Sequence, residues 1–141
     1  MDVGKALIDI LDNDSNITDV IGVKGSTSVM RCFPSAFRVP QSTTLPFMTY
    51  QIISDTPNNT KNGVSEYDYV TVQISVYDNR YSDLQTLVGL VRTALDYTSG
   101  TFNGVAVDKI FFQSASEAFD ESFGDNGLYQ YNMDFRFNLN L

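Results

Sequence analysis

Four carboxylates in the last quarter of the chain are the residues whose type and spacing come nearest to a chemical site: Glu117, Asp120, Glu121 and Asp125. Carboxylate oxygens bind hard cations, and a pair of carboxylates can hydrolyse a glycosidic bond. The spacing does not match an EF-hand loop, because Phe119 and Phe123 interrupt it, and nothing in the sequence locates a sugar-binding groove. The pattern is more typical of a solvated acidic loop between two strands.

Cys32 is the single cysteine, and it follows Arg31, whose charge could lower the pKa of the thiol. A nucleophilic thiol needs a base, and the sequence contains no histidine to act as one. The lack of histidine also excludes His-ligated zinc and haem, and one cysteine cannot build a thiolate metal site. No glycine-rich phosphate-binding motif is present.

These absences predict a protein with no cofactor, no metal and no enzymatic activity, in which Cys32 is a small buried core residue. An enzyme acting through carboxylates is the alternative from another class, and a tightly bound divalent metal in the purified protein would favour it. The triplets 16–18 and 58–60 match the N-glycosylation pattern. Because no secretory signal precedes them, we interpret both as turn residues.

Length and charge limit the kind of partner. The chain has 141 residues, which predicts one domain over residues 1–141, and 43% of them are hydrophobic, as in globular proteins. The formal charge is −8, and the 9 Lys and Arg residues are scattered, so binding to nucleic acid or to an anionic membrane is disfavoured. No apolar stretch approaches the roughly 20 residues of a membrane span.

Hydrophobic spacing predicts the elements that must position these residues. Apolar residues at helical spacing predict a helix over 3–12, a short second turn capped by Ser15 or Asn16 and ending at Gly22, and a long helix from Ser82 to Tyr97. Ser82 and Gln85 fit a capping box at the start of the long helix. Strands are predicted over 28–33, 47–53, 67–77, 105–113 and 129–139, the third and the last with strict alternation.

The order α-β-β-β-α-β-β predicts a two-layer α+β fold, in which a mainly antiparallel sheet of about five strands packs on two amphipathic helices. Tyrosines then become of interest: Tyr67, Tyr69 and Tyr77 lie opposite the valines of their strand, and Tyr129 and Tyr131 begin the last strand. If the two strands are neighbours, these tyrosines gather on the polar face of the sheet. Packing beneath a loop and a subunit interface are both open for them.

Taken together, the order and spacing of several short segments resemble the tail-completion proteins of long-tailed bacteriophages, also called tail-to-head joining or tail-terminator proteins. The matching segments run through nearly the whole chain: 6–11, 17–22, Arg31-Cys32-Phe33-Pro34, 45–51, 70–74, Val91-Arg92, Ala94-Leu95-Asp96, Ser99-Gly100, Gly104-Val105, Gly127-Leu128-Tyr129 and Asp134-Phe135. The family has no catalytic residues to carry over.

This resemblance implies a structural virion protein, assembled in the host cytoplasm, that forms a ring, typically a hexamer. Such a ring caps the tail tube, joins it to the head connector and lets DNA pass through its lumen. The charge of −8 agrees with a lumen to which DNA does not adhere. In a ring, the exposed tyrosines and the sheet edges would form the heterologous contacts between neighbouring subunits. A tail-tube or minor tail protein, or a small assembly chaperone of the same virion, is the alternative.

Overall fold

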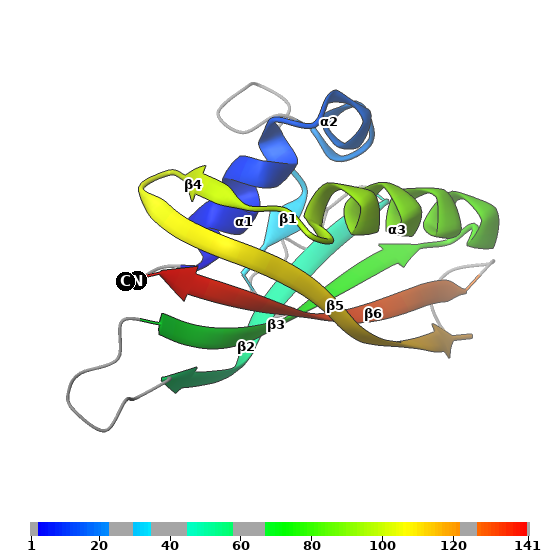
Figure 1. Cartoon of the computed structure of the whole chain (residues 1–141). Coiled ribbons are helices and arrows are strands. Elements are labelled where there is room, and N and C mark those ends of the chain that lie inside the picture. Colours follow the sequence, from blue (N-terminus) through cyan, green and yellow to red (C-terminus); the bar gives the residue numbers. More distant parts are fainter. Residues whose placement is uncertain (1–2, 23–29, 35–44, 58–66, 122–126, 141) are drawn as a thin grey trace.

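The computed structural model describes residues 3–22, 30–34, 45–57, 67–121 and 127–140 (Figure 1). Their helices and strands follow one another as α1 (Val3–Asp12), α2 (Ser15–Ile21), β1 (Cys32–Phe33), β2 (Phe47–Pro57), β3 (Tyr67–Asp78), α3 (Tyr81–Leu95), β4 (Gly100–Phe102), β5 (Val105–Asp120) and β6 (Leu128–Asn140). The three helices lie on one side of a curled sheet (Figure 1).

The strands form one sheet of six, in the order β1-β2-β3-β6-β5-β4. β1 pairs with β2 in parallel, and every other pairing is antiparallel. The predicted two-layer α+β fold is therefore confirmed, with differences in detail: α2 is a separate helix, and β4 is a sixth strand that the sequence pattern did not indicate. Both additions are short, and each lies against the larger elements.

The core lies between the sheet and the helices. Its centre is made of two paired rows, in which Val72 faces Phe135 and Ile74 faces Met133 across β3 and β6. The predicted apolar stripe of α3 covers these rows with five buried residues: Leu84, Leu87, Val88, Val91 and Leu95. Burying each such side chain contributes about 1.5–3 kcal/mol, so this layer accounts for much of the stability of the fold.

The helix starts differ from the sequence prediction. Asp14, and not Ser15 or Asn16, caps α2, where its side chain accepts hydrogen bonds from the amides of Asn16 and Ile17. α2 ends as expected at Gly22, whose φ of 93° favours glycine. Asn16–Thr18 therefore lies in the first turns of α2 and not in a loop, whereas the triplet 58–60 lies outside the described residues.

The predicted capping box of α3 is absent from the structure. Arg80 occupies the N-cap position and makes no side-chain cap. Instead, Asp78 Oδ1 accepts hydrogen bonds from the backbone amides of Asn79, at 2.7 Å, and of Arg80, at 3.4 Å. The side chain of Gln85 turns away to Glu117, so it is not available to complete the box.

Two strands are longer than their hydrophobic pattern indicated. β2 continues to Pro57 and β5 to Asp120, each paired on one side with a long neighbour, β3 or β6. Bulges between Ile52 and Ser54 and between Phe112 and Ser114 break the alternation from which strand length is judged. The predicted strand 28–33 is shorter in the structure: among its described residues, only Cys32–Phe33 form a strand, β1.

Candidate assembly surface

The sheet face turned away from the helices carries a regular pattern of side chains, and we call it the outer face. On β3 and β6 it is formed by paired polar residues, because each residue lies directly opposite its partner: Ser75 with Asn132, Gln73 with Asp134, and Thr71 with Arg136. All three described helices lie on the other side of the sheet (Figure 1). The outer face is thus a polar surface on the side of the curled sheet opposite the core (Figure 1).

Hydrogen bonds run across the outer face from strand to strand. Ser75 Oγ donates to Asn132 Oδ1 at 2.7 Å, and Gln130 Nε2 donates to the same oxygen at 2.8 Å. Asn132 Nδ2 reaches Ser116 Oγ on β5 at 3.5 Å, and Ser114 Oγ donates to Asp134 Oδ2 at 3.2 Å. These short side chains hold one another in place, so the face is ordered before any partner binds.

Arg136 occupies the middle of the outer face. Its guanidinium carbon lies 5.3 Å from the ring centre of Tyr69 and 5.2 Å from that of Phe111, so the cation lies near two aromatic rings. Its Nε is buried, and within the part of the chain that the structure describes this atom has no hydrogen-bond partner; the same holds for Asn138 Oδ1. The sequence pattern placed Arg136 on this polar face by alternation, but its aromatic neighbours come from two other strands and could not be read locally.

The five tyrosines predicted to gather on one face are divided between the two faces. β3 and β6 are indeed neighbours, and Tyr69 and Tyr77 lie on the outer face, where Tyr77 stacks on Phe47 with ring centres 4.7 Å apart. The backbone of Tyr67 pairs with Asn140. Tyr131, however, lies opposite the buried Val76, and Tyr129 lies opposite Asp78. Because cross-strand partners share a face, these two belong to the helix side, and the prediction was wrong for them.

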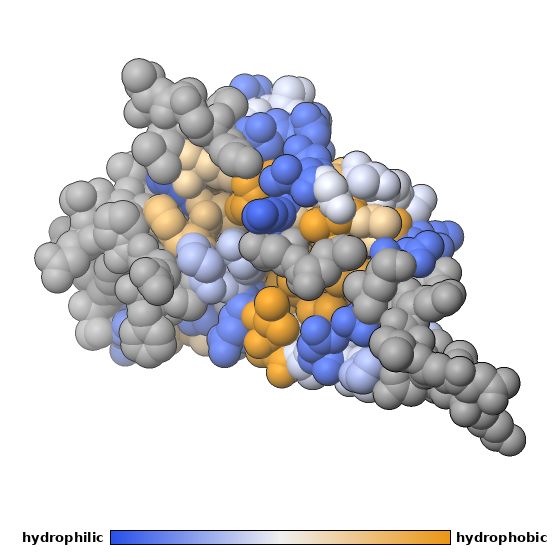
Figure 2. Space-filling view, turned by 90° about the vertical axis from the view of Figure 1, so that its left-hand side faces the viewer, coloured by the Kyte–Doolittle hydropathy of each residue, from blue (hydrophilic) through white to orange (hydrophobic). Residues whose placement is uncertain are grey.

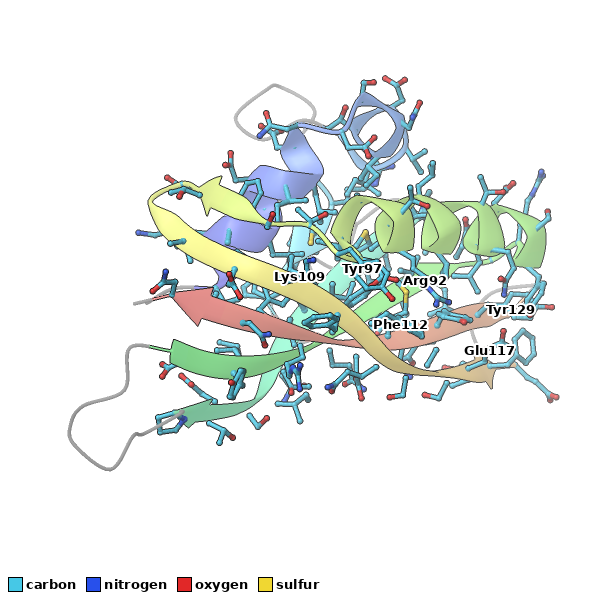
Figure 3. The ribbon with its side chains drawn as sticks, viewed as in Figure 1. Arg92, Tyr97, Lys109, Phe112, Glu117 and Tyr129 are labelled. Carbon is cyan, nitrogen blue, oxygen red and sulfur yellow. The ribbon has the colours of Figure 1, made fainter. Side chains whose placement is uncertain are left out.

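Tyr129 instead belongs to an aromatic cluster beside the start of α3. Its ring lies 5.3 Å from that of Tyr81 in an edge-on arrangement and 4.6 Å from that of Phe119. The Tyr81 hydroxyl donates to Glu117 Oε1 at 2.7 Å, and this hydrogen bond raises the pKa of Tyr81. Figure 3 shows Glu117 and Tyr129 side by side where β5 and β6 meet the helix.

The acidic residues do not form the loop that the sequence predicted. Glu117 and Asp120 lie on β5, Glu121 follows directly in a turn, and Asp125 lies outside the described residues. The strand continues because residues 115–120 pair with β6, which a polar sequence alone does not reveal. Among the residues that the structure describes, no three His, Cys, Asp or Glu side chains are grouped to hold a metal ion. Glu117 is engaged by Tyr81 and Gln85.

Cys32 is buried in the core, as predicted, and burial raises the pKa of its thiol to about 12. The effect expected from Arg31 does not arise, since that guanidinium points elsewhere: its Nε donates to the Pro46 carbonyl at 2.9 Å, and an NH₂ group donates to the Val20 carbonyl. Arg31 therefore connects the end of α2 with the start of β2 through hydrogen bonds to both. The thiol is a packing group and has little nucleophilic character at neutral pH.

In the described parts of the chain, none of the helices has the length and apolar character needed to cross a membrane.

The fold of the chain is shared with a protein of known structure. The structure of this chain is similar to a chain in a solved structure titled "Virion of native gene transfer agent (GTA) particle", with a TM-score of 0.67 and 13% sequence identity over 96% of this chain and 92% of the other. At this identity the likeness shows a shared fold, one that is found in a virion particle. No well-characterised protein matches the sequence itself.

The particular family follows from the sequence. Residues 5–139 match the family described as "Tail completion protein gp17", and the chain belongs to this family. The resemblance noted from short segments is therefore confirmed across most of the chain. This makes the protein a structural component of a phage-type tail.

Proposed function

We propose that the protein is a ring subunit that closes the end of the tail tube and joins it to the head connector, with DNA passing through the lumen. The observation that carries this proposal is the family match over residues 5–139. The rigid outer face and the charge of −8 support it, because an ordered polar surface suits subunit contact and an acidic ring does not retain DNA. The protein then has no enzymatic role, and it is part of the virion after assembly in the host cytoplasm.

We infer that the outer face contributes contacts in this assembly, and that Tyr69 and Tyr77 are among the aromatic residues that make them. Tyrosine supplies a large contact area at low entropic cost, and Arg136 between two rings adds a preorganised cation. Tyr129 and Tyr131 pack against the core on the helix side. Tyr69→Ser should therefore weaken ring assembly more than Tyr129→Ser does. Tyr129→Ser should act mainly by lowering the stability of the folded subunit.

Native mass spectrometry and negative-stain electron microscopy of the purified protein test the proposal. Closed rings of one subunit number, which bind to the end of tails that lack the protein and allow them to join heads, are the expected result. Open stacked tubes would point to a tail-tube protein. A monomer that binds neither tails nor heads would overturn the proposed function.

A further inference from the structure

The sheet has two long stretches of edge strand. β1 pairs only with Met48 and Thr49 of β2, and β4 pairs only with residues 105–107 of β5. The segment after α3 bonds to β5 a little further on, where Tyr97 N donates to the Ile110 carbonyl and Ile110 N donates to the Thr98 carbonyl. Beyond these points, within the described residues, Gln51–Pro57 and Gln113–Phe119 pair with another strand on one side only.

Both stretches are exposed along their whole length. The first carries Ile52 and Ile53, which are 50% and 51% exposed, and the second ends at Phe119, which is 47% exposed. The side of the molecule where β2 ends shows apolar surface among polar residues (Figure 2). An exposed edge with adjacent large apolar residues is a template for another strand, and such edges are normally blunted or covered.

The two edges fit one another in direction. β2 and β5 are related by three antiparallel pairings, through β3 and β6, so they run in opposite directions. When a copy in the same orientation is placed beside β2, its β5 edge therefore continues the antiparallel pattern of the sheet. The contact uses two different surfaces of the same chain, and repeated rotation closes such contacts into rings.

The two edges also fit in the chemistry of their outer side. On the outer side, β2 presents Ser54 and Thr56, and β5 presents Ser114 and Ser116. On the helix side, β2 presents Ile52, Asp55 and Pro57, and β5 presents Ala115, Glu117 and Phe119. Glu117 is engaged within its own chain by Tyr81 and Gln85. On the outer side, antiparallel pairing thus places hydroxyl groups beside hydroxyl groups, and such cross-strand pairs stabilise neighbouring strands.

We propose that Gln51–Pro57 of one subunit pairs with Gln113–Phe119 of the next, so that the six-stranded sheets of neighbouring copies join into one continuous sheet. This inference rests on the proposed function, because it specifies how the copies of the ring meet. The exposed segments are the last parts of β2 and β5 and lie at opposite ends of the sheet (Figure 1). Each subunit is therefore displaced along the strands relative to the last, and a closed sheet needs such a stagger.

Disulfide trapping tests the contact directly. Ser54→Cys is combined in turn with Ser114→Cys, Ser116→Cys and Ala118→Cys, all on the outer side of the two edges, and the assembled protein is mildly oxidised. One of the three pairs should give covalent multimers in a denaturing gel that stop at the subunit number of the ring. Ser54→Cys with Thr93→Cys, on the exposed side of α3, is the control and should give monomers. The buried Cys32 does not compete.

Ile53→Lys tests the same contact by blocking it, since an edge lysine opposes strand addition. Its folding should be unchanged because Ile53 is half exposed, while the association constant of each contact should fall about tenfold or more, a loss of about 1.4 kcal/mol per contact. The fraction of protein in rings should fall further, because every contact of the ring is weakened. Thr93→Lys adds the same charge on α3 and should assemble normally.

The outcomes separate the two proposals. Rings that form in the wild type but give no cross-link with any of the three pairs, together with normal assembly of Ile53→Lys, would overturn the edge pairing and leave the ring function in place. A wild-type protein that forms no assembly and is missing from tails would overturn the ring function, and the edge pairing with it.

Discussion

The hydroxyl of Tyr81, at the start of α3, donates a hydrogen bond of 2.7 Å to Glu117 Oε1 on β5. Gln85 Nε2, one turn later on the helix, donates to the same oxygen at 3.2 Å. This contact links the end of the helix layer to the far end of the longest strand. Glu117, one of the four carboxylates considered as a possible chemical site, therefore joins the helix layer to the sheet.

Replacing Glu117 with glutamine should make Tyr81 ionise at lower pH than in the wild type. The hydrogen bond to Glu117 is the main cause of the raised pKa of Tyr81, and an amide is a weaker acceptor without charge. Ultraviolet difference spectroscopy across the alkaline range measures tyrosine ionisation. Asp108→Asn, an exposed change on β5, is the control, and equal titration curves for both variants would contradict the assignment.

The alternation of apolar residues predicted β3 and β6 and which of their side chains are buried, because sheet periodicity is imposed by burial on one face. It also contained the correct position of Tyr131: counting back in steps of two from Met133 reaches Tyr131 on the helix side. The prediction for Tyr131 relied instead on its place near the start of a strand that neighbours the third, and the face was assigned wrongly.

Other features could not be predicted locally. The exposed ends of β2 and β5 are strands because β3 and β6 pair with them, and residues such as Ser114 and Ser116 carry no strand signal of their own. The rings beside Arg136 come from β3 and β5, so no spacing within β6 indicates them. Long-range pairing determines both features.

Arg31→Met should lower the free energy of unfolding by about 2–4 kcal/mol. The guanidinium donates to the carbonyls of Val20 and Pro46, and hydrogen bonds of a charged donor contribute about 1.5–3 kcal/mol each. Urea denaturation followed by circular dichroism measures the loss. Arg92→Met is the matched control, because Arg92 is exposed and lies 3.9 Å above the Phe112 ring, a contact of about 0.5–1 kcal/mol (Figure 3). Equal losses would contradict the role of Arg31.

Asp78→Asn should stabilise the protein at neutral pH and have little effect in acid. Asp78 is only 4% exposed, and burial raises the pKa of its carboxyl above the ordinary value of 3.8, with Asp83 adding to the rise and two backbone hydrogen bonds opposing it. A raised pKa means that the folded state holds the proton more tightly. The wild type therefore loses stability as the pH rises from about 3.8 through the folded pKa.

Melting temperatures between pH 4 and pH 7 test this. At pH 7 the Asp78→Asn variant should melt at a higher temperature than the wild type, and the difference should shrink toward pH 4. The asparagine keeps the oxygen that caps the Asn79 and Arg80 amides. Asp83→Asn, in the first turn of α3, removes repulsion of Asp78 but also a favourable charge at a helix N-terminus, so it should stabilise the protein less than Asp78→Asn does. A pH-independent gain for Asp78→Asn would contradict the argument.

Alanine at Gly127 and at Gly89 should change stability in opposite directions. Gly127 has a φ of +74°, and a Cβ there would lie 2.4 Å from Phe119 Cζ and 3.0 Å from the Asp120 carbonyl oxygen. Alanine must therefore adopt a strained backbone and displace the Phe119 ring, so the free energy of unfolding should fall by about 1–3 kcal/mol.

Gly89 lies in α3, and a Cβ there meets nothing within 4 Å, so alanine should raise stability by about 0.5–1 kcal/mol through its better helix propensity. Chemical denaturation measures the change in the free energy of unfolding for both variants. A Gly127→Ala variant as stable as the wild type would contradict the predicted strain and the clash with the Phe119 ring.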